Sequence, residues 1–96
     1  MFQELDHKRG IARLLECFAC SAAAQASPER SLRLAGVAAS LRQNLGAPLT
    51  PGEQVKLERG LEPARQALSS AAGATLWLEG WVLPLGKAVE EAMTQL

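Results

Sequence analysis

Residues 29–49 read ERSLRLAGVAASLRQNLGAPL, and this stretch decides the fold. Its apolar residues recur at helical spacing and share one face; they are Leu34, Ala38, Leu41 and Leu45. Ser27 and Pro28 stand just before them as an N-cap and a first helical residue, and Gly46 follows as a typical helix stop. The stretch therefore predicts an amphipathic helix over residues 28–45 and the connection to the next helix.

A second amphipathic pattern precedes this helix, over residues 3–25. Its apolar stripe consists of Ile11, Leu14, Leu15, Phe18 and Ala22. Arg9, Arg13 and Glu16 fall on the opposite face. We predict that this segment is the first helix and that it pairs with the helix over residues 28–45.

A capping box at Thr50-Pro51-Gly52-Glu53 starts a third helix. The Thr50 oxygen and the Glu53 carboxylate can each bind an amide that would otherwise lack a partner. The apolar stripe that follows consists of Leu57, Leu61, Ala64 and Leu68. Pro63 lies inside this pattern and removes a backbone donor, which in a helix interior costs about 3 kcal/mol or forces a kink. We expect a bend at residues 60–63.

Two shorter helical patterns complete the chain, over residues 71–81 and 85–96. The last one places Leu85, Ala88, Val89, Ala92 and Leu96 on one face. Short connections favour antiparallel neighbours. We predict an all-α fold of about five antiparallel helices in one domain, residues 1–96, with a helical hairpin at 1–46 and C-terminal helices at 47–96. The hairpins are expected to stack into a short right-handed array or a bundle.

The composition agrees with an all-α fold, because Ala and Leu dominate the 96 residues and Tyr is absent. Ten basic and ten acidic side chains cancel and are interspersed, which argues against nucleic-acid binding. The longest apolar run, residues 76–85, is much shorter than the roughly 20 residues that cross a bilayer, and the N-terminus lacks an apolar signal core. We expect a soluble, cytoplasmic chain without membrane contact and with reduced thiols.

Cys17 and Cys20 have the spacing of redox and metal motifs. A zinc tetrahedron needs a second pair of ligands, and the sequence offers only one histidine, His7. The pair also lies in mid-helix, where no helix N-terminus would stabilise a thiolate. We therefore interpret both cysteines as small helix residues and predict no metal site.

No other chemistry-bearing residues form a convincing active site. Residues 80–88, GWVLPLGKA, differ from a phosphate-binding loop because five residues separate the glycines and Ala88 follows the lysine, so we interpret them as a turn between helices. Six carboxylates are expected on solvated helix faces, without a catalytic partner: Glu53, Glu58, Glu62, Glu79, Glu90 and Glu91. We predict no catalytic residue, no cofactor and no enzymatic activity.

Trp77 and Trp81 lie one helical turn apart. We expect Trp77 in the core, whereas Trp81 could equally be a core residue or a surface contact. An exposed Trp81 would form an apolar patch with Val82, Leu83 and Leu85, of the kind that marks a protein interface. These four residues are the predicted partner surface.

The hairpin resembles a tetratricopeptide repeat. Four residues match the packing positions of the first helix of that repeat: Leu15, Phe18, Ala19 and Ala22. Four more match those of the second helix: Ser31, Leu32, Ala35 and Ala38. Small residues at such positions let two antiparallel helices approach closely.

The longer pattern from residue 10 to residue 68, followed by Trp77, Glu79, Gly80 and the closing LGKAVEEAM, resembles the C-terminal helical region of large bacterial regulators. In these regulators a signalling NTPase of the STAND type is followed by tetratricopeptide-like repeats, and a LuxR-type or winged DNA-binding domain or a cyclase domain is often on the same chain. This sequence departs from the family pattern at Pro63, Gly73, Trp81, Pro84, Gly86 and Lys87.

The resemblance implies a non-catalytic module for protein–protein interaction or capping, in which this segment packs against preceding repeats of a bacterial signalling or transcriptional regulator. The alternative is a free-standing helical protein that forms homodimers or larger homo-oligomers as a structural or adaptor unit, burying apolar faces that a single repeat leaves open. A small enzyme, or a metal-binding redox protein built on Cys17 and Cys20, is a third hypothesis with less support.

Overall fold

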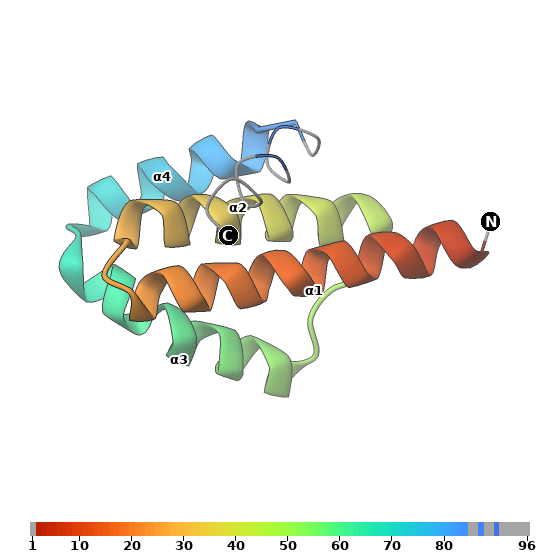
Figure 1. Ribbon diagram of the computed structural model, residues 1–96, viewed down its shortest axis with the longest axis horizontal. Coiled ribbons are helices and arrows are strands. Elements are labelled where there is room, and N and C mark those ends of the chain that lie inside the picture. Colours follow the sequence, from red (N-terminus) through yellow and green to blue (C-terminus); the bar gives the residue numbers. More distant parts are fainter. Residues whose placement is uncertain (1, 85–86, 88–89, 91–96) are drawn as a thin grey trace.

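The computed structural model describes residues 2–84, 87 and 90, with side chains from residue 7 onward. These residues form four α-helices and contain no β-strand: α1 (Phe2–Ala24), α2 (Pro28–Leu45), α3 (Pro51–Ala67) and α4 (Ser70–Val82) (Figure 1). The all-α prediction is confirmed. The predicted fifth helix, residues 85–96, lies outside the described residues except for Lys87 and Glu90, which are both helical.

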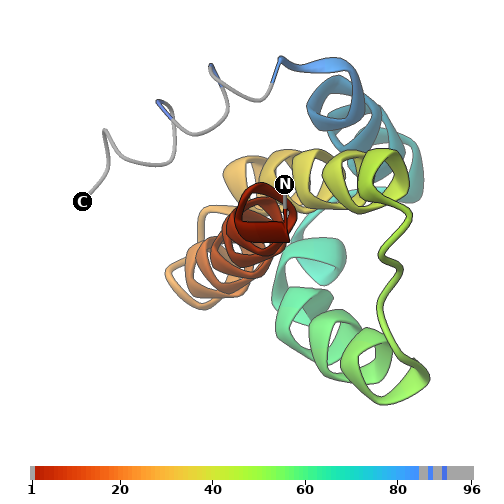
Figure 2. The same ribbon diagram turned by 90° about the vertical axis from the view of Figure 1, so that its right-hand side faces the viewer.

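The helix α2 occupies the centre and packs against the other three helices. Figures 1 and 2 show α1 antiparallel to α2 on one side and α4 on the other side of α2, while α3 lies below α1. Each helix reverses the direction of the preceding one, so consecutive helices alternate along the long axis of the molecule (Figure 1). Such alternation follows from the short connections.

The buried side chains form a main cluster between α1, α2 and α3, made of Leu15, Ala19, Leu34, Ala35, Val37, Ala38 and Leu61. A smaller cluster contains Ala23, Leu32 and Ala64. The eight positions that resemble a tetratricopeptide repeat are all buried except Phe18, which is half-buried. The Ser31 hydroxyl lies among them and donates to the Ala19 carbonyl oxygen at 2.7 Å, which ties α2 to α1.

The predicted faces of α1 need one correction. Leu14, placed on the apolar stripe, is 57% exposed. Glu16, placed on the opposite face, is half-buried because both of its carboxylate oxygens accept hydrogen bonds from the Arg42 guanidinium group, at 2.5 and 3.0 Å. The ion pair therefore turns a polar residue toward α2 and leaves Leu14 in solvent.

The helix ends follow the predicted signals, with one exception. Both parts of the capping box are present, with 3.2 Å from the Glu53 nitrogen to the Thr50 hydroxyl and 3.0 Å from the Thr50 nitrogen to the Glu53 carboxylate. The helix α3 continues through Pro63 to Ala67, so the proline does not end it. Ser27 makes no side-chain cap hydrogen bond, contrary to the prediction, because the turn before α2 is held by backbone bonds.

The turn between α1 and α2 ends α1 with Ala26 in the left-handed backbone region, at a φ of 60°. The Ser27 nitrogen donates to the Ala22 carbonyl at 2.8 Å and the Ala26 nitrogen donates to the Ala23 carbonyl at 3.3 Å, which is the Schellman pattern. The end of α2 repeats the pattern, with Gly46 at a φ of 63°. One of the two left-handed positions therefore carries a side chain.

Two glycines set the contact between α2 and α4. A Cβ atom built on Gly36 would lie 2.0 Å from the Trp77 carbonyl oxygen, and one built on Gly80 would lie 1.9 Å from the Arg33 carbonyl oxygen. No side chain fits at either position, so the two backbones touch directly. This contact holds α4 in place and fixes which of its faces points outward.

Candidate functional site

The predicted partner surface is only partly exposed. Val82 is 76% exposed, whereas Trp81 and Leu83 are half-buried and Leu83 packs against the main core cluster. Leu85 lies outside the described residues. The structure therefore keeps Val82 on the surface and covers Trp81 and Leu83 in part.

Trp77 and Trp81 stack on each other, with ring centroids 5.1 Å apart and an angle of 26° between the planes. Both are half-buried, and Trp77 packs against the main core cluster, as expected for a core position. Stacked rings of this kind contribute about 0.5–1.5 kcal/mol beyond the area that they bury. The stacked pair therefore helps to attach α4 to the core and does not form an exposed anchor for a partner.

The exposed apolar surface lies one turn earlier than predicted. Leu78 is 56% exposed and precedes Val82 by four residues, so the two side chains lie on one face of α4. The exposed residues Ala71 and Ala74 continue this face toward the start of the helix. We call these four residues the α4 outer face. The spacing of these residues places them on one face of the helix, but only the glycine contact with α2 shows that this face points outward.

Helix α4 carries a single charged residue, Glu79, whose carboxylate lies 3.7 Å from the Arg33 guanidinium group of α2. A helix with so little charge and two exposed large aliphatic side chains is unusual at a protein surface. The α4 outer face is therefore suited to a contact with another apolar surface.

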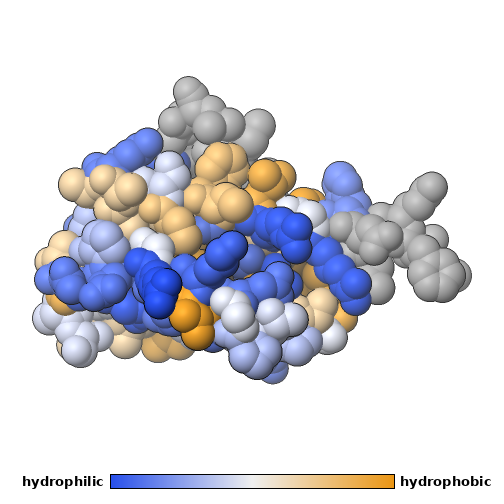
Figure 3. Space-filling view, turned by 90° about the horizontal axis from the view of Figure 1, so that it is seen from below, coloured by the Kyte–Doolittle hydropathy of each residue, from blue (hydrophilic) through white to orange (hydrophobic). Residues whose placement is uncertain are grey.

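Helix α1 has a second exposed apolar site at Leu14. Exposed Gly10 and Cys17 lie on the same face, at four residues before and three residues after it. Figure 3 views the molecule from below and shows hydrophobic residues gathered on its upper side, where α1 lies, above a row of hydrophilic residues. Among the described residues, large apolar side chains are thus exposed on α1 and α4, and also on α3 at Val55.

The two cysteines are free thiols, with Cys17 exposed and Cys20 half-buried. Burial, and then the nearby Cys17 and Glu16, raise the pKa of the Cys20 thiol, so the reactive thiolate is disfavoured. Cys20 packs against Gly60 of α3, where an added Cβ would lie 2.3 Å from its sulfur. Within residues 7–84, 87 and 90 no group of three or more His, Cys, Asp or Glu side chains could hold a metal ion.

Of the segment at residues 80–88, the structure describes residues 80–84 and 87. Gly80 lies inside α4 and is buried against the Arg33 backbone, so its amide does not face a ligand. Residues 80–82 belong to α4, which ends at Val82, whereas Leu83 and Pro84 lie outside any helix, as expected of a turn.

The carboxylates named above have other partners than catalytic residues. Glu58 lies 3.2 Å from the Arg65 guanidinium group, and Glu62 accepts a hydrogen bond from Gln66 at 3.1 Å. Glu90 is exposed and Glu91 lies outside the described residues. Glu53 belongs to the capping box and to an ion pair with Arg13 at 3.7 Å. Glu53, Glu58 and Glu62 are thus engaged by backbone, arginine or glutamine groups.

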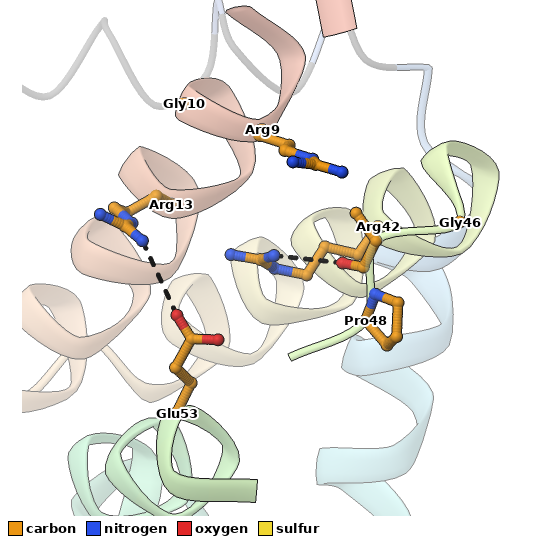
Figure 4. Close-up of a pocket in the computed structure, with 8 residues that line it drawn as sticks. Arg9, Gly10, Arg13, Arg42, Gly46, Pro48 and Glu53 are labelled. Carbon is orange, nitrogen blue, oxygen red and sulfur yellow. Dashed lines mark hydrogen bonds and ion pairs between the residues drawn. The ribbon is translucent and has the colours of Figure 1, made fainter. Parts of the chain in front are cut away.

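A cavity that the sequence did not indicate lies between the N-terminal half of α1, the end of α2 and the start of α3. Its volume is about 600 Å³, and it is lined by Arg9, Gly10, Arg13, Arg42, Gly46, Ala47, Pro48 and Glu53. Figure 4 shows Arg9 and Arg13 on α1 and Arg42 on α2 around this space, with the Arg13 guanidinium group directed toward Glu53. We call it the arginine cavity.

The chain gives no significant match to any protein-family model, curated protein or solved structure. In the described part of the chain, none of the helices has the length and apolar character needed to cross a membrane.

Proposed function

We propose that the chain is a non-catalytic module for protein–protein interaction or capping, and that it is the C-terminal helical-repeat part of a bacterial signalling or transcriptional regulator. The observation that carries the proposal is the α4 outer face, where Leu78 and Val82 are 56% and 76% exposed on a helix with one charged residue. Exposed apolar patches of this kind are typical of protein interfaces rather than of free surfaces.

The arrangement of the helices supports a repeat array. Helix α1 packs against α3 and α2 packs against α4, so equivalent helices of the two consecutive pairs are neighbours. In arrays of helical hairpins each unit contacts only its neighbours, and both ends of the unit are apolar until a further unit covers them. Leu14 on α1 and the α4 outer face are the two edges at which further hairpins would pack.

The alternative function is a free-standing helical protein that homo-oligomerises as a structural or adaptor unit. The same α4 outer face supports it, because an apolar patch on one copy can pair with the identical patch on a second copy around a two-fold axis. The two hypotheses differ in what covers Leu78 and Val82.

Light scattering over a wide concentration range separates them, applied to the wild-type chain and to the double variant Leu78→Ser with Val82→Ser. A monomer whose free energy of unfolding does not change in the double variant supports the module, because the face is then open to an outside partner. A dimer that the double variant dissociates supports the alternative. Val55→Ser is the matched control, since Val55 is a 54% exposed aliphatic residue on α3.

One result would contradict both hypotheses. If the double variant remained monomeric but lost about 2 kcal/mol or more of stability, relative to Val55→Ser, the α4 outer face would belong to the chain's own core.

A further inference from the structure

The arginine cavity contains one guanidinium group that is held rigidly. The Arg42 side chain binds both oxygens of Glu16, at 2.5 and 3.0 Å, and donates to the Ala47 carbonyl at 3.2 Å. The left-handed Gly46 turns the chain back so that this carbonyl comes within reach. Arg42 and the loop at residues 46–48 therefore form a fixed wall of the cavity.

The other two guanidinium groups are much less engaged. Arg9 and Arg13 lie one helical turn apart on α1 and are both exposed. The Arg13 guanidinium group is 3.7 Å from the Glu53 carboxylate, which is too long for a hydrogen bond. Arg9 makes no hydrogen bond or ion pair with any other described residue. Most of the donors of these two side chains are free to bind a ligand.

The cavity carries an excess of positive charge, although the whole chain is formally neutral. Three guanidinium groups and one carboxylate line it, and Glu16, which is not one of the lining residues, neutralises Arg42. One positive charge therefore remains without a counterion among the described residues, and the like charges of Arg9 and Arg13 repel each other at this spacing. An anion placed between them would relieve that repulsion.

The lining selects among anions. Arginine forks match the geometry of carboxylate and phosphate groups, which they bind through two parallel hydrogen bonds. The residues that line the cavity include no aromatic ring, so a nucleobase would have nothing to stack on. The wall of Gly46, Ala47 and Pro48 instead offers a smooth backbone surface, and the space is far larger than a single free oxyanion needs.

We propose that the arginine cavity is a binding site for an acidic peptide segment of a partner protein, whose side-chain carboxylates bind Arg9 and Arg13 against the fixed Arg42 wall. None of the lining residues belongs to α4, so the site is distinct from the α4 outer face and does not depend on it. The ligand chemistry is the oxyanion, and the peptide backbone lies along the loop.

An NMR titration of the isotope-labelled chain tests the proposal, with a short oligoglutamate peptide as the probe. An oligoglutamine peptide of the same length and inorganic phosphate are the two comparison probes. The amide signals of residues 9–13 and 46–53 should shift with oligoglutamate and not with oligoglutamine. Binding should weaken as salt is added, because the contacts are ionic.

Two double variants show whether the peptide binds in the arginine cavity. Arg9→Gln with Arg13→Gln should weaken oligoglutamate binding at least about tenfold, since two charge-assisted contacts are lost. Lys56→Gln with Arg59→Gln removes the same charge from exposed residues of α3 that do not line the cavity, and should change the affinity by less than about twofold. Both double variants alter exposed side chains, and their thermal unfolding checks that they fold.

A substitution that should raise the affinity for oligoglutamate tests the proposal even if the arginine variant folds poorly. Glu53→Gln removes the competing carboxylate and retains a residue that suits a capping box, so oligoglutamate should bind about fivefold tighter. Glu62→Gln, which removes a charge elsewhere on α3, should change the affinity by less than about twofold.

Three results would overturn the proposal. The first is an equal loss of affinity in the two double variants, which would mean non-specific charge attraction. The second is saturation by inorganic phosphate of the same signals at an affinity equal to that of oligoglutamate, which would assign the site to a free anion. The third is the absence of any shift at residues 9–13 and 46–53.

Discussion

The contacts that α2 makes with α1 and with α4 are built in opposite ways. Against α1, alanine, leucine and serine side chains interlock, and the Arg42 and Glu16 pair closes one end. Where α2 meets α4, each helix contributes a glycine at the point of contact: Gly36 on α2 and Gly80 on α4. The first contact is adjustable, because side chains can move, whereas the second is a contact between backbones and has little room to adapt.

The difference bears on function. The backbone contact fixes α4 so that its apolar residues Leu78 and Val82 face outward. A helix held by side-chain interlocking could rotate slightly to hide them. The α2–α4 contact therefore determines the surface on which the proposed interaction depends.

The largest effect is expected from adding one methyl group to the α2–α4 contact. Gly36→Ala or Gly80→Ala should lower the free energy of unfolding by about 3 kcal/mol or more, because the new Cβ would meet a carbonyl oxygen at 2.0 or 1.9 Å. Urea denaturation followed by tryptophan fluorescence measures this, since Trp77 and Trp81 are both on α4.

Gly52→Ala is the control for both variants. No atom lies within 4 Å of a Cβ built on Gly52, so this change should cost nothing and can stabilise the helix by up to about 1 kcal/mol. If all three substitutions had equal effects, helix propensity rather than the close contact would be responsible.

The ion pair in the α1–α2 contact should matter less. Glu16→Gln should cost about 1–2 kcal/mol, because it leaves the Arg42 charge without its partner in a place where both side chains are only 12–13% exposed. Glu58→Gln breaks a pair with Arg65 whose side chains are 44–47% exposed, and should cost less than about 0.5 kcal/mol. Equal costs in thermal unfolding would contradict a partly buried role for Glu16.

The two helix-ending turns sharpen the comparison further. Gly46→Ala should destabilise the chain by about 1 kcal/mol, because the residue has a φ of 63°. Ala26→Gly should stabilise it by about 0.5–1 kcal/mol, because Ala26 already has a φ of 60° and carries a side chain. Opposite signs in the melting temperature are the expected result, and a loss from Ala26→Gly would show that the alanine methyl packs usefully.

The smallest effect is a pH dependence at the start of α3. The Thr50 backbone N–H, the Thr50 hydroxyl and, to a smaller extent, Arg42 and Arg13 hold the pKa of Glu53 below its usual range. Because the folded pKa is lowered, this stabilisation is present above the unfolded pKa of about 4.3 and is lost as pH falls through the folded pKa.

Glu53→Gln should therefore flatten the fall of stability below about pH 4, and urea midpoints measured across that range test it. A profile identical to that of the wild-type chain would mean that the capping box contributes through geometry alone.

Local rules predicted much of the fold. The capping box at Thr50 and Glu53, the proline at residue 28 and the stop at Gly46 all appear where the sequence indicates, because each depends on a few neighbouring residues. Helical spacing also found most of the core. It failed at Leu14 and Glu16, because periodicity selects a face but not which residue at its border is covered by a partner helix.

The candidate surfaces were harder to predict. The sequence named Val82 as a surface residue but not Leu78, and Trp81 and Leu83 are only half-exposed. The arginine cavity brings together residues 9, 13 and 42, which are far apart in sequence and carry no shared motif. Neither site could be recognised before the helices were placed against one another.

The sequence by itself determined an all-α chain and where its described helices begin and end, because capping, proline and apolar spacing act over a turn or two. The tertiary structure decided which faces remained open. Gly36 and Gly80 act through the absence of a side chain, which leaves no mark in a hydrophobic pattern, and Arg42 acts through a carboxylate 26 residues away. Contacts of both kinds exist only once distant segments have met.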